Sequence, residues 1–396
     1  MTPHSLPLTP HRAGPQVLIV TGEASGDLHG ANLIRAAREL DPQLHFFGIG
    51  GSRMAAAGCE LLVRSEELAV MGLVEIVGHF PVIYRAFSRL KAILRGPERP
   101  DALVLIDFPE FNLRLAKVAK RIGVPVLYYV SPQVWAWRRG RVKQIAAVVD
   151  RLAAIFPFEP ELYRGLDIQV EYVGHPLLDE FRIDTPRQTY LTRIGIDPAR
   201  PVVGIFPGSR RNELHFNFAV MLAAAERIRE CHPEVAFLLP VAPSFSRCEF
   251  EARLAGHDLP LNFVDGNIYD AANACDAILA VSGTVTLQIA LVGTPLAIIY
   301  RMAPLTYAIG RRLVRVPHIG LANIVAGAGV AREFIQDQAT AENLAAEIVR
   351  ILDDPAYALQ LRQGLGKVGK RLGEDGCSRR VAGMLLSMLQ INNKVR

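Results

Sequence analysis

Short, continuous runs of apolar residues recur along the first half of the chain. They lie at residues 16–22, 45–50, 60–63, 102–107, 124–130, 151–156 and 170–174. Continuous rather than alternating apolar runs are typical of parallel strands that are covered on both faces. The intervening stretches 26–40, 80–95 and 112–122 are compatible with helices. This alternation predicts an α/β fold with a doubly wound parallel sheet.

A second series of apolar runs follows, at residues 201–208, 236–241, 261–266, 277–283 and 295–301. Between the two series, residues 179–200 are polar and contain prolines, which predicts a linker. We therefore expect one Rossmann-like domain over 16–178 and another over 201–340. Residues 1–15 are interpreted as a disordered lead-in, and 341–396 as helices that can pack back on the N-terminal domain. Two such domains predict a cleft at the carboxyl ends of their strands, where the chemistry is expected.

The composition excludes several classes of protein. Half of the 396 residues are hydrophobic and 21% are charged, which excludes a disordered chain. No uninterrupted apolar run of about 18 residues is present, so no membrane-spanning helix is expected. The five cysteines are scattered without CxxC spacing, which favours a reduced, cytoplasmic setting with neither disulfides nor structural zinc. The net charge of +5 suits anionic partners but does not by itself indicate nucleic-acid binding.

The turn after the first predicted strand reads TGEASGDLHG and carries Glu23, Ser25 and Asp27. Glycines allow a strand to turn sharply into a helix, but this spacing is not the dinucleotide pattern GxGxxG. Two carboxylates would repel a diphosphate, so we interpret them as acceptors of hydrogen bonds from sugar hydroxyls. The alternative is a tight turn in which Asp27 caps the helix.

The corresponding turn of the second half, IFPGSRRNELHFN, has the opposite charge. It contains Gly208, Ser209, Arg210 and, three residues later, Glu213. Small residues, arginines and a helix N-terminus together can hold a diphosphate without a metal ion. The alternative is an ordinary strand-to-helix turn with surface arginines.

A second turn rich in hydroxyl groups, VSGTVTLQIALVGTP, follows a later strand. Ser282, Gly283 and Thr284 can donate to phosphate oxygens there, and Gln288 can reach a ribose. Together the two turns predict a nucleotide-sugar donor in the C-terminal half. The acceptor is then expected in the N-terminal half.

Asp107 is the candidate general base. It ends an apolar strand and is followed by Phe108 and Pro109, so its carboxylate is expected to face the cleft. A partly desolvated carboxylate can accept a proton from an attacking hydroxyl. Its rivals are Glu110 and Glu23, and the alternative is that Asp107 caps the following helix.

Aromatic and basic residues meet in YYVSPQVWAWRRGRVKQI. Trp135 can stack on a sugar, and Arg138 can bind a phosphate. The alternative is that this segment is the solvated, basic start of a helix. No larger basic face accompanies them, so nucleic acid is the less favoured partner. The apolar and then amphipathic segment 69–95, with the basic segment 301–315, could instead lie on an anionic membrane. Core packing of the same apolar residues is at least as well supported by the composition.

Several motifs together resemble those of the lipid-A-disaccharide synthases, nearly collinearly after residue 16. They are GEASGD (22–27), GIGG (48–51), MGLVEI (71–76), IDFPEFNLRLAK (106–117), SPQVWAWRRGR (131–141), PFE (157–159), VGHPL (173–177), PGSRRNE (207–213), SGTVTL (282–287) and YRM (300–302). The combination of SPQVWAW and GEASGD is highly specific for this family.

The resemblance implies a glycosyltransferase of the two-domain GT-B type that binds UDP in its C-terminal domain, with no cofactor and no metal. The implied reaction is the inverting transfer of 2,3-diacylglucosamine from its UDP form to 2,3-diacylglucosamine 1-phosphate (lipid X). The products are the β-1,6-linked disaccharide 1-phosphate of lipid A biosynthesis and UDP. The residues that carry over are Glu23, Asp107, Arg210 and Asn323.

The resemblance also implies peripheral attachment to the cytoplasmic face of the inner membrane and is compatible with a homodimer. Two departures concern UDP binding: Gln288 stands where the family usually has Glu, and Ala322 replaces a proline before Asn323. The alternative function is another UDP-sugar enzyme of the same plan, either a lipid-acceptor transferase or a sugar-nucleotide epimerase. A non-catalytic binding protein for a sugar or nucleotide is the remaining alternative.

Overall fold

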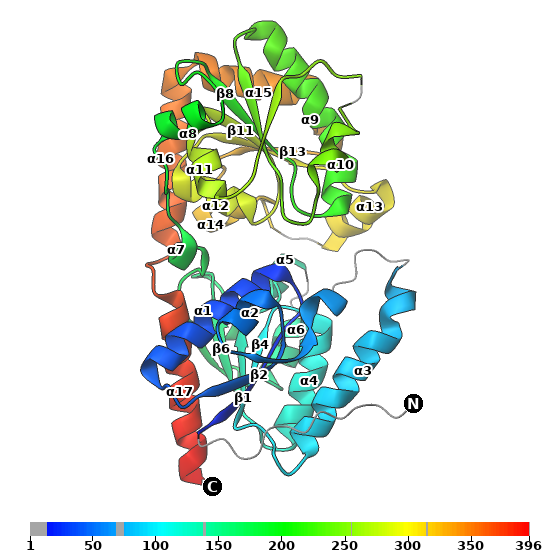
Figure 1. Cartoon of the computed structure of the whole chain (residues 1–396), viewed down its shortest axis with the longest axis vertical. Coiled ribbons are helices and arrows are strands. Elements are labelled where there is room, and N and C mark those ends of the chain that lie inside the picture. The colour runs from blue at the N-terminus through cyan, green and yellow to red at the C-terminus, as the bar shows by residue number, and fades with distance from the viewer. Residues whose placement is uncertain (1–13, 69–74, 138–139, 255, 314–315, 396) are drawn as a thin grey trace. The chain divides into compact units, whose positions relative to one another are not determined.

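The computed structural model describes residues 14–68, 75–137, 140–254, 256–313 and 316–395. The chain forms two compact units (Figure 1). The first consists of Met1–Asp179 and Glu374–Arg396, and the second of Glu180–Gly373. Each unit is an α/β structure with one parallel sheet, which confirms the predicted fold class.

The sheet of the first unit has seven parallel strands in the order β3-β2-β1-β4-β5-β6-β7. The strands are β1 (Gln16–Thr21), β2 (His45–Gly50), β3 (Glu60–Arg64), β4 (Ala102–Ile106), β5 (Val126–Tyr129), β6 (Arg151–Ala154) and β7 (Gln169–Tyr172). The central strands β1, β4 and β5 are buried almost throughout, as their continuous apolar runs predict. The strand order reverses direction between β1 and β4, which makes their carboxyl ends a natural binding edge.

Helices cover both faces of this sheet. The helices of the first unit are α1 (Ala24–Leu40), α2 (Ser52–Ala56), α3 (Glu75–Arg95), α4 (Pro109–Arg121), α5 (Val134–Trp137), α6 (Arg141–Ala146), α7 (Leu177–Glu180), which continues into the second unit, and α17 (Cys377–Val395). Short 3-10 turns lie at η1 (Ser65–Glu67) and η2 (Pro160–Tyr163). On one face α3, α4 and α6 pack on Leu18, Leu103 and Leu105, and on the other α1 packs beside α17 (Figure 1).

The second unit has a six-stranded parallel sheet in the order β10-β9-β8-β11-β12-β13. Its strands are β8 (Val202–Phe206), β9 (Ala236–Pro240), β10 (Leu261–Val264), β11 (Ala277–Val281), β12 (Leu296–Tyr300) and β13 (Arg332–Ile335). The sequence pattern predicted the first five of these strands but not β13. This edge strand is short and carries exposed, charged Arg332, so it lacks the continuous apolar run of a central strand.

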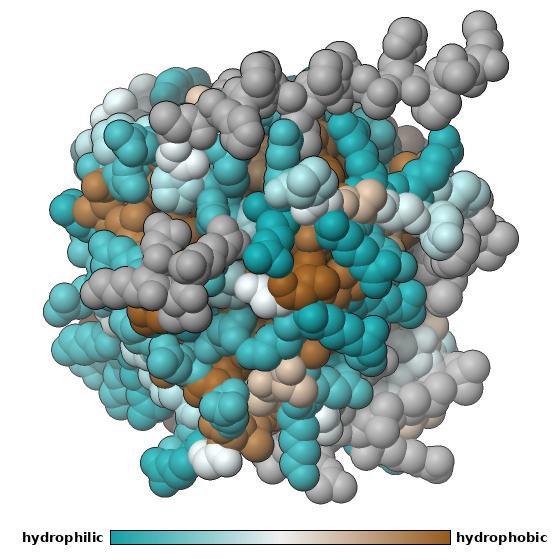
Figure 2. Space-filling view, turned by 90° about the horizontal axis from the view of Figure 1, so that it is seen from below, coloured by the Kyte–Doolittle hydropathy of each residue, from teal (hydrophilic) through white to brown (hydrophobic). Residues whose placement is uncertain are grey.

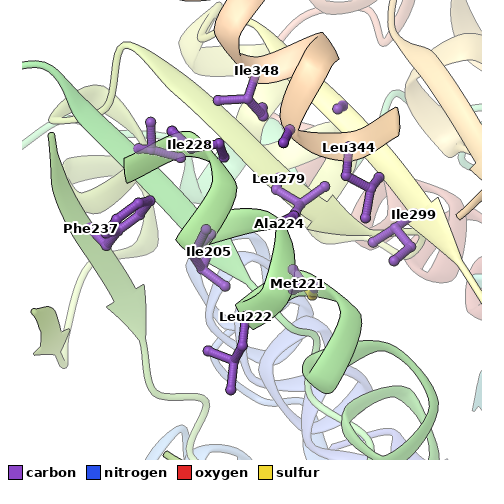
Figure 3. Packing of buried hydrophobic residues seen from close by; sticks show 14 of the residues in the cluster. Ile205, Met221, Leu222, Ala224, Ile228, Phe237, Leu279, Ile299, Leu344 and Ile348 are labelled. Atoms are coloured by element: carbon purple, nitrogen blue, oxygen red, sulfur yellow. The ribbon is translucent and has the colours of Figure 1, made fainter. Parts of the chain in front are cut away.

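The helices of the second unit are α8 (Arg187–Arg193), α9 (Arg211–Cys231), α10 (Arg247–Glu251), α11 (Ile268–Asn273), α12 (Val285–Val292), α13 (Pro304–Leu313), α14 (Leu321–Ala326), α15 (Ala341–Asp353) and α16 (Pro355–Arg371), with η3 (Gln336–Gln338). Figure 3 shows how Leu279 and Ile299 of the sheet meet Met221 of α9 and Leu344 of α15. Truncating a leucine in such a core costs about 2–5 kcal/mol. The packed sheet therefore provides a rigid base for the loops at its carboxyl edge.

The segments near the crossings between the units have defined structure. Within the expected linker, α8 packs on α11 and buries Tyr190 and Leu191 in the second unit. Helices α15 and α16 belong to the second unit, whereas α17 returns to the first. The Asp179 carboxylate accepts hydrogen bonds from the Gly376, Cys377 and Ser378 amides at distances of 2.7–3.0 Å. It thereby joins the end of α7 to the start of α17, since a carboxylate stabilises the N-terminus of a helix.

Candidate active site

The loops that follow β1, β4 and β5 lie side by side at the carboxyl edge of the first sheet, because these strands are neighbours. They carry the candidate residues Glu23, Asp107 and Trp135. Gly22 packs against the Phe108 ring so closely that a Cβ atom added at Gly22 would overlap it. The structure thus brings the GEASGD turn directly against the IDFPEF turn.

Asp107 is half-buried and adopts an unusual backbone conformation. Its φ is 47° and that of Phe108 is 49°, so two consecutive residues with side chains occupy the left-handed region. Each such residue costs about 1–3 kcal/mol, and such strain is often found at functional sites. Helix α4 begins at Pro109 with Phe108 at the N-cap position, so Asp107 is not the N-cap that the alternative required.

Glu23 and Asp27 have different surroundings. Glu23 is exposed at the N-cap of α1, and Ser25, two residues later, is also exposed. Asp27 is buried, and its carboxylate accepts hydrogen bonds from the amides of Gly51 (2.6 Å), Arg53 (3.0 Å) and Met54 (3.1 Å). It therefore stabilises the N-terminus of the neighbouring helix α2. A contact between Asp27 and the acceptor stays a prediction.

Trp135 packs into an aromatic cluster and is only 6% exposed. Its ring lies edge-on to Phe156 and Phe158, with centroid separations of 5.9 and 5.3 Å, and Phe156 stacks on Phe158. Burial therefore makes its packing role evident, while stacking on a sugar stays a prediction. Arg138, the expected phosphate ligand beside it, lies outside the described residues, as do residues 69–74, Arg315 and most of the expected lead-in.

Two buried titratable residues lie next to this cluster. Burial raises the pKa of Glu159 to about 7, although the amides of Phe156 and Ile155 hydrogen-bond to its carboxylate and oppose the shift. Burial lowers the pKa of His175 to about 3, with a smaller effect from the charge of His29. The centroid of the His175 ring lies 5.3 Å from that of Phe156. Glu159 and His175 follow β6 and β7 in the chain, and both are buried.

In the second unit, the PGSRRNE turn follows β8. Gly208 has a φ of 93°, and a side chain there would overlap the Glu213 carboxylate. That carboxylate accepts hydrogen bonds from the amides of Ser209 (3.0 Å) and Arg210 (3.1 Å) and lies 3.2 Å from the Arg210 guanidinium. Glu213 thus completes a capping box at the start of α9 and occupies amides that sequence analysis assigned to a diphosphate. The Arg210 side chain is exposed.

The SGTVTL turn follows β11, the neighbour of β8, so both turns lie at the same edge of the sheet. The Ser282 hydroxyl donates to the Ile319 carbonyl at 3.0 Å, whereas Gly283 is half-buried and Thr284 is exposed. Gln288 lies beside the Tyr269 hydroxyl, whose pKa is raised to about 12 by burial. The structure therefore places the two turns expected to bind the donor at the same edge of the sheet.

Asn323 is fully buried, and its amide makes four hydrogen bonds inside the unit. The Nδ2 group donates to the Ala331 carbonyl and the Glu333 carboxylate, each at 2.7 Å. The Oδ1 atom accepts from the amides of Val330 (2.8 Å) and Ala331 (2.9 Å). These four bonds use the whole hydrogen-bonding capacity of the amide. Asn323 therefore holds the loop before β13, and a direct contact with the nucleotide stays a prediction.

Two further amides, which sequence analysis missed, hold the segment after β12. Asn217 of α9 donates to the Arg301 carbonyl (3.3 Å) and accepts from the Arg301 amide (2.8 Å). Gln336 makes the same pair of bonds with Met302, each at 3.1 Å. A polar residue within the apolar sequence FNFAVML was the available signal for Asn217. These amides fix the backbone that carries the exposed Arg301 side chain at the same edge of the sheet.

A family model described as "Lipid-A-disaccharide synthetase" matches residues 17–379. A lipid-A-disaccharide synthase of Syntrophotalea carbinolica is 65% identical over 370 residues, which cover 93% of this chain and 94% of the relative. One of Geobacter sulfurreducens is 53% identical, with 96% and 98% of the two chains covered.

Solved structures share the fold at low sequence identity. UDP-GlcNAc 2-epimerase from Neisseria meningitidis, bound to UDP-GlcNAc, has a TM-score of 0.63 and 12% identity, and the match covers 94% of this chain and 100% of that one. The calicheamicin glycosyltransferase CalG4 has a TM-score of 0.56 and 13% identity, with 95% and 98% of the chains covered. Sequence identities this low show a shared fold alone.

Proposed function

The chain belongs to the lipid-A-disaccharide synthetase family, and we propose that the carboxyl edges of its two sheets carry the two halves of that family's reaction. It is a UDP-sugar glycosyltransferase of lipid A biosynthesis, as its close relatives indicate. The donor is UDP-2,3-diacylglucosamine and the acceptor is lipid X. An epimerase function has weaker support, because the epimerases share only the fold with this chain.

The reaction requires a base for the acceptor and stabilisation of the leaving group. The 6-hydroxyl of lipid X attacks the anomeric carbon of the donor, the bond from that carbon to UDP breaks with inversion, and the hydroxyl proton passes to the base. Asp107 is the proposed base. Its half-buried position beyond β4 and its strained backbone support this role, and Glu23 on the adjoining turn is its rival.

The acceptor is assigned to the first unit. Exposed Glu23 and Ser25 at the start of α1 offer a carboxylate and a hydroxyl to sugar hydroxyl groups. The packing of Gly22 against Phe108 supports this assignment, because it keeps both groups beside the Asp107 turn. The predicted cleft between the two domains stays a prediction.

The donor is assigned to the second unit. Exposed Arg210 supplies a positive charge for the UDP diphosphate, and the half-buried or exposed Ser282, Gly283 and Thr284 supply amides and hydroxyls. Since Glu213 occupies the amides of Ser209 and Arg210, we assign the diphosphate contact chiefly to the arginine side chain. A guanidinium that neutralises the developing charge on UDP lowers the barrier to its departure.

Peripheral membrane attachment is proposed through α3. Tyr84 is 62% exposed, and Arg85 and Arg95 are exposed on the same helix, while Ile83 is half-buried. Among the described residues, no helix is long and apolar enough to cross a bilayer. On the face shown in Figure 2, the coloured apolar residues form separate patches divided by polar side chains. Attachment to anionic lipids through basic side chains suits such a mixed surface.

The proposed function is tested by incubating the protein with both substrates in detergent and following UDP release and disaccharide formation. We expect equimolar UDP and disaccharide 1-phosphate, and no UDP release when lipid X is omitted. Conversion of the UDP-sugar without lipid X, or no product with both substrates, would contradict the proposal. A stereochemical analysis of the product should find the β linkage that inversion requires.

A further inference from the structure

The left-handed backbone at Asp107 and Phe108 requires surroundings that hold it. Both residues carry side chains, and neither is stable in this region without compensating contacts. Val130, whose carbonyl accepts a 3.2 Å hydrogen bond from the Asp107 amide, is itself left-handed with a φ of 55°. The ends of β4 and β5 are thus strained together.

Two buried donors hold the Asp107 carbonyl. The Tyr128 hydroxyl donates to it at 2.9 Å, and the Asn112 Nδ2 group donates at 2.6 Å. The same Nδ2 group donates to the Ile106 carbonyl at 3.2 Å. Tyr128 lies on β5 and Asn112 on the first turn of α4, and both are fully buried. The peptide after Asp107 is therefore fixed from two different elements.

The Tyr128 hydroxyl and the Asn112 amide keep their protons over the whole pH range of an enzyme assay. Burial raises the pKa of Tyr128 well above its usual value, and the neighbouring Asp107 charge raises it further. The Asn112 amide does not titrate. The hydrogen bonds to the Asp107 carbonyl therefore persist whatever the ionisation of the catalytic groups.

The Phe108 side of the turn is fixed by aromatic packing. Its ring stacks on Phe111 at 5.1 Å, and Phe111 meets Phe87 of α3 edge-on at 5.6 Å. Gly22 leaves room for the Phe108 ring on the opposite side. The strained dipeptide is thus held by two contacts: the hydrogen bonds from Tyr128 and Asn112 to the Asp107 carbonyl, which we call the clamp, and the packing of the Phe108 ring.

We propose that Tyr128 and Asn112 are positioning residues that hold Asp107 in its left-handed conformation, the one in which its carboxylate serves as the base. This inference rests on the proposed function, which names Asp107 as that base. Without the clamp, the backbone can relax toward an unstrained region and turn the carboxylate away. Misplacement of a catalytic group by about 1 Å can cost roughly a hundredfold in rate.

The first test is Tyr128→Phe, which removes one hydroxyl and preserves the ring. We expect kcat to fall about tenfold to hundredfold while KM for UDP-2,3-diacylglucosamine changes less than about twofold. The matched control is Tyr129→Phe, because Tyr129 is equally buried on the same strand but its hydroxyl lies 3.3 Å from the Cys377 sulfur. That control should retain the wild-type kcat. A Tyr128→Phe enzyme with wild-type kcat would overturn the inference.

A double-mutant cycle with Asp107→Asn separates positioning from general destabilisation. If Tyr128 acts through Asp107, Tyr128→Phe should lower the residual activity of Asp107→Asn by less than about twofold. An undiminished effect of Tyr128→Phe in the Asp107→Asn background would overturn the inference. Asn112→Ser, which keeps a donor on a shorter side chain, should retain more activity than Asn112→Ala, and equal losses in the two variants would count against the clamp.

These outcomes distinguish the inference from the proposed function. If Asp107→Asn alone keeps near-normal kcat, the base assignment itself fails. If Asp107→Asn is inactive and Tyr128→Phe is fully active, only the positioning role is refuted.

Discussion

Replacing Asn323 with alanine is expected to destabilise the second unit rather than to remove a contact with UDP. The substitution deletes four hydrogen bonds and leaves the Ala331 amide and carbonyl without the Asn323 partner, whereas the Val330 amide keeps its bond to the Ala328 carbonyl. Each buried polar group that loses its partner costs about 1–3 kcal/mol, and these costs are not additive. We therefore expect a loss of about 3–5 kcal/mol, a large share of a typical domain stability.

Two spectroscopic probes can localise this loss. Both tryptophans lie in the first unit, so their fluorescence follows unfolding of that unit, whereas far-UV circular dichroism follows both units. In urea, Asn323→Ala should move the dichroism transition to lower concentrations and leave the fluorescence transition nearly in place. Hydrogen exchange should become faster at the Ala331 amide, which has lost the Asn323 acceptor, and less so at the Val330 amide, which keeps the Ala328 carbonyl as acceptor at 3.0 Å.

The same variant distinguishes the two roles of Asn323. At a temperature where it remains folded, Asn323→Ala should bind UDP within about threefold of the wild-type affinity, because its side chain makes its bonds within the protein. Asn323→Asp serves as a comparison, since it keeps an acceptor for the two amides but sets a carboxylate against the Glu333 carboxylate. Wild-type stability of Asn323→Ala combined with a hundredfold weaker UDP affinity would refute this reasoning.

Three further outcomes are expected. Gly22→Ala should lower the stability of the first unit by about 1–3 kcal/mol in urea, because the new Cβ overlaps the Phe108 ring, and an unchanged midpoint would contradict the close packing. In the folded protein the pKa of Glu159 is raised to about 7 from its usual 4.5, so the stability that it contributes is full below pH 4.5 and is lost as the pH rises through 7. The free energy of unfolding should therefore fall by on the order of 3 kcal/mol between pH 4.5 and 8. Urea unfolding of Glu159→Gln over the same pH range should lack this decrease. Replacing both Arg85 and Arg95 with glutamine should weaken binding to anionic vesicles about thirtyfold at low salt, and sedimentation that depends on neither salt nor these residues would contradict attachment through α3.

The sequence predicted the fold well where burial alone decides it. The run HFFGIG coincides with β2, and ALVLID ends one residue beyond β4, because strands buried on both faces require uninterrupted apolar residues. The apolar pattern did not predict β13, because this strand forms by pairing with β12, which is distant in the sequence. A short edge strand has no apolar pattern of its own.

The candidate site was predicted in outline but not in its contacts. The turns with Glu23, Asp107 and Arg210 lie at the carboxyl edges of their sheets, as the strand-to-helix pattern implied. Asp27 and Asn323, by contrast, use their polar groups on backbone amides. A side-chain oxygen can accept a hydrogen bond from a ligand or from a backbone amide equally well. Which of the two it does depends on segments that come near it only in the folded chain.

The left-handed backbone of Asp107 was equally hidden from the sequence. An Asp before Phe and Pro does not predict a positive φ. The donors that stabilise this backbone conformation come from β5 and α4. Its strain depends on tertiary contacts rather than on local propensity. The strained turn is nevertheless the feature that distinguishes Asp107 most clearly from Glu23 as the candidate base.

The most direct test of the account is the rate of disaccharide formation by Asp107→Asn, measured beside its affinity for UDP. General-base catalysis typically contributes a factor of about 10²–10⁴, so kcat should fall by that amount. UDP affinity should stay within about threefold of wild type, because the donor is assigned to the other unit. A near-normal kcat in Asp107→Asn would contradict the account and make Glu23 the leading candidate for the base.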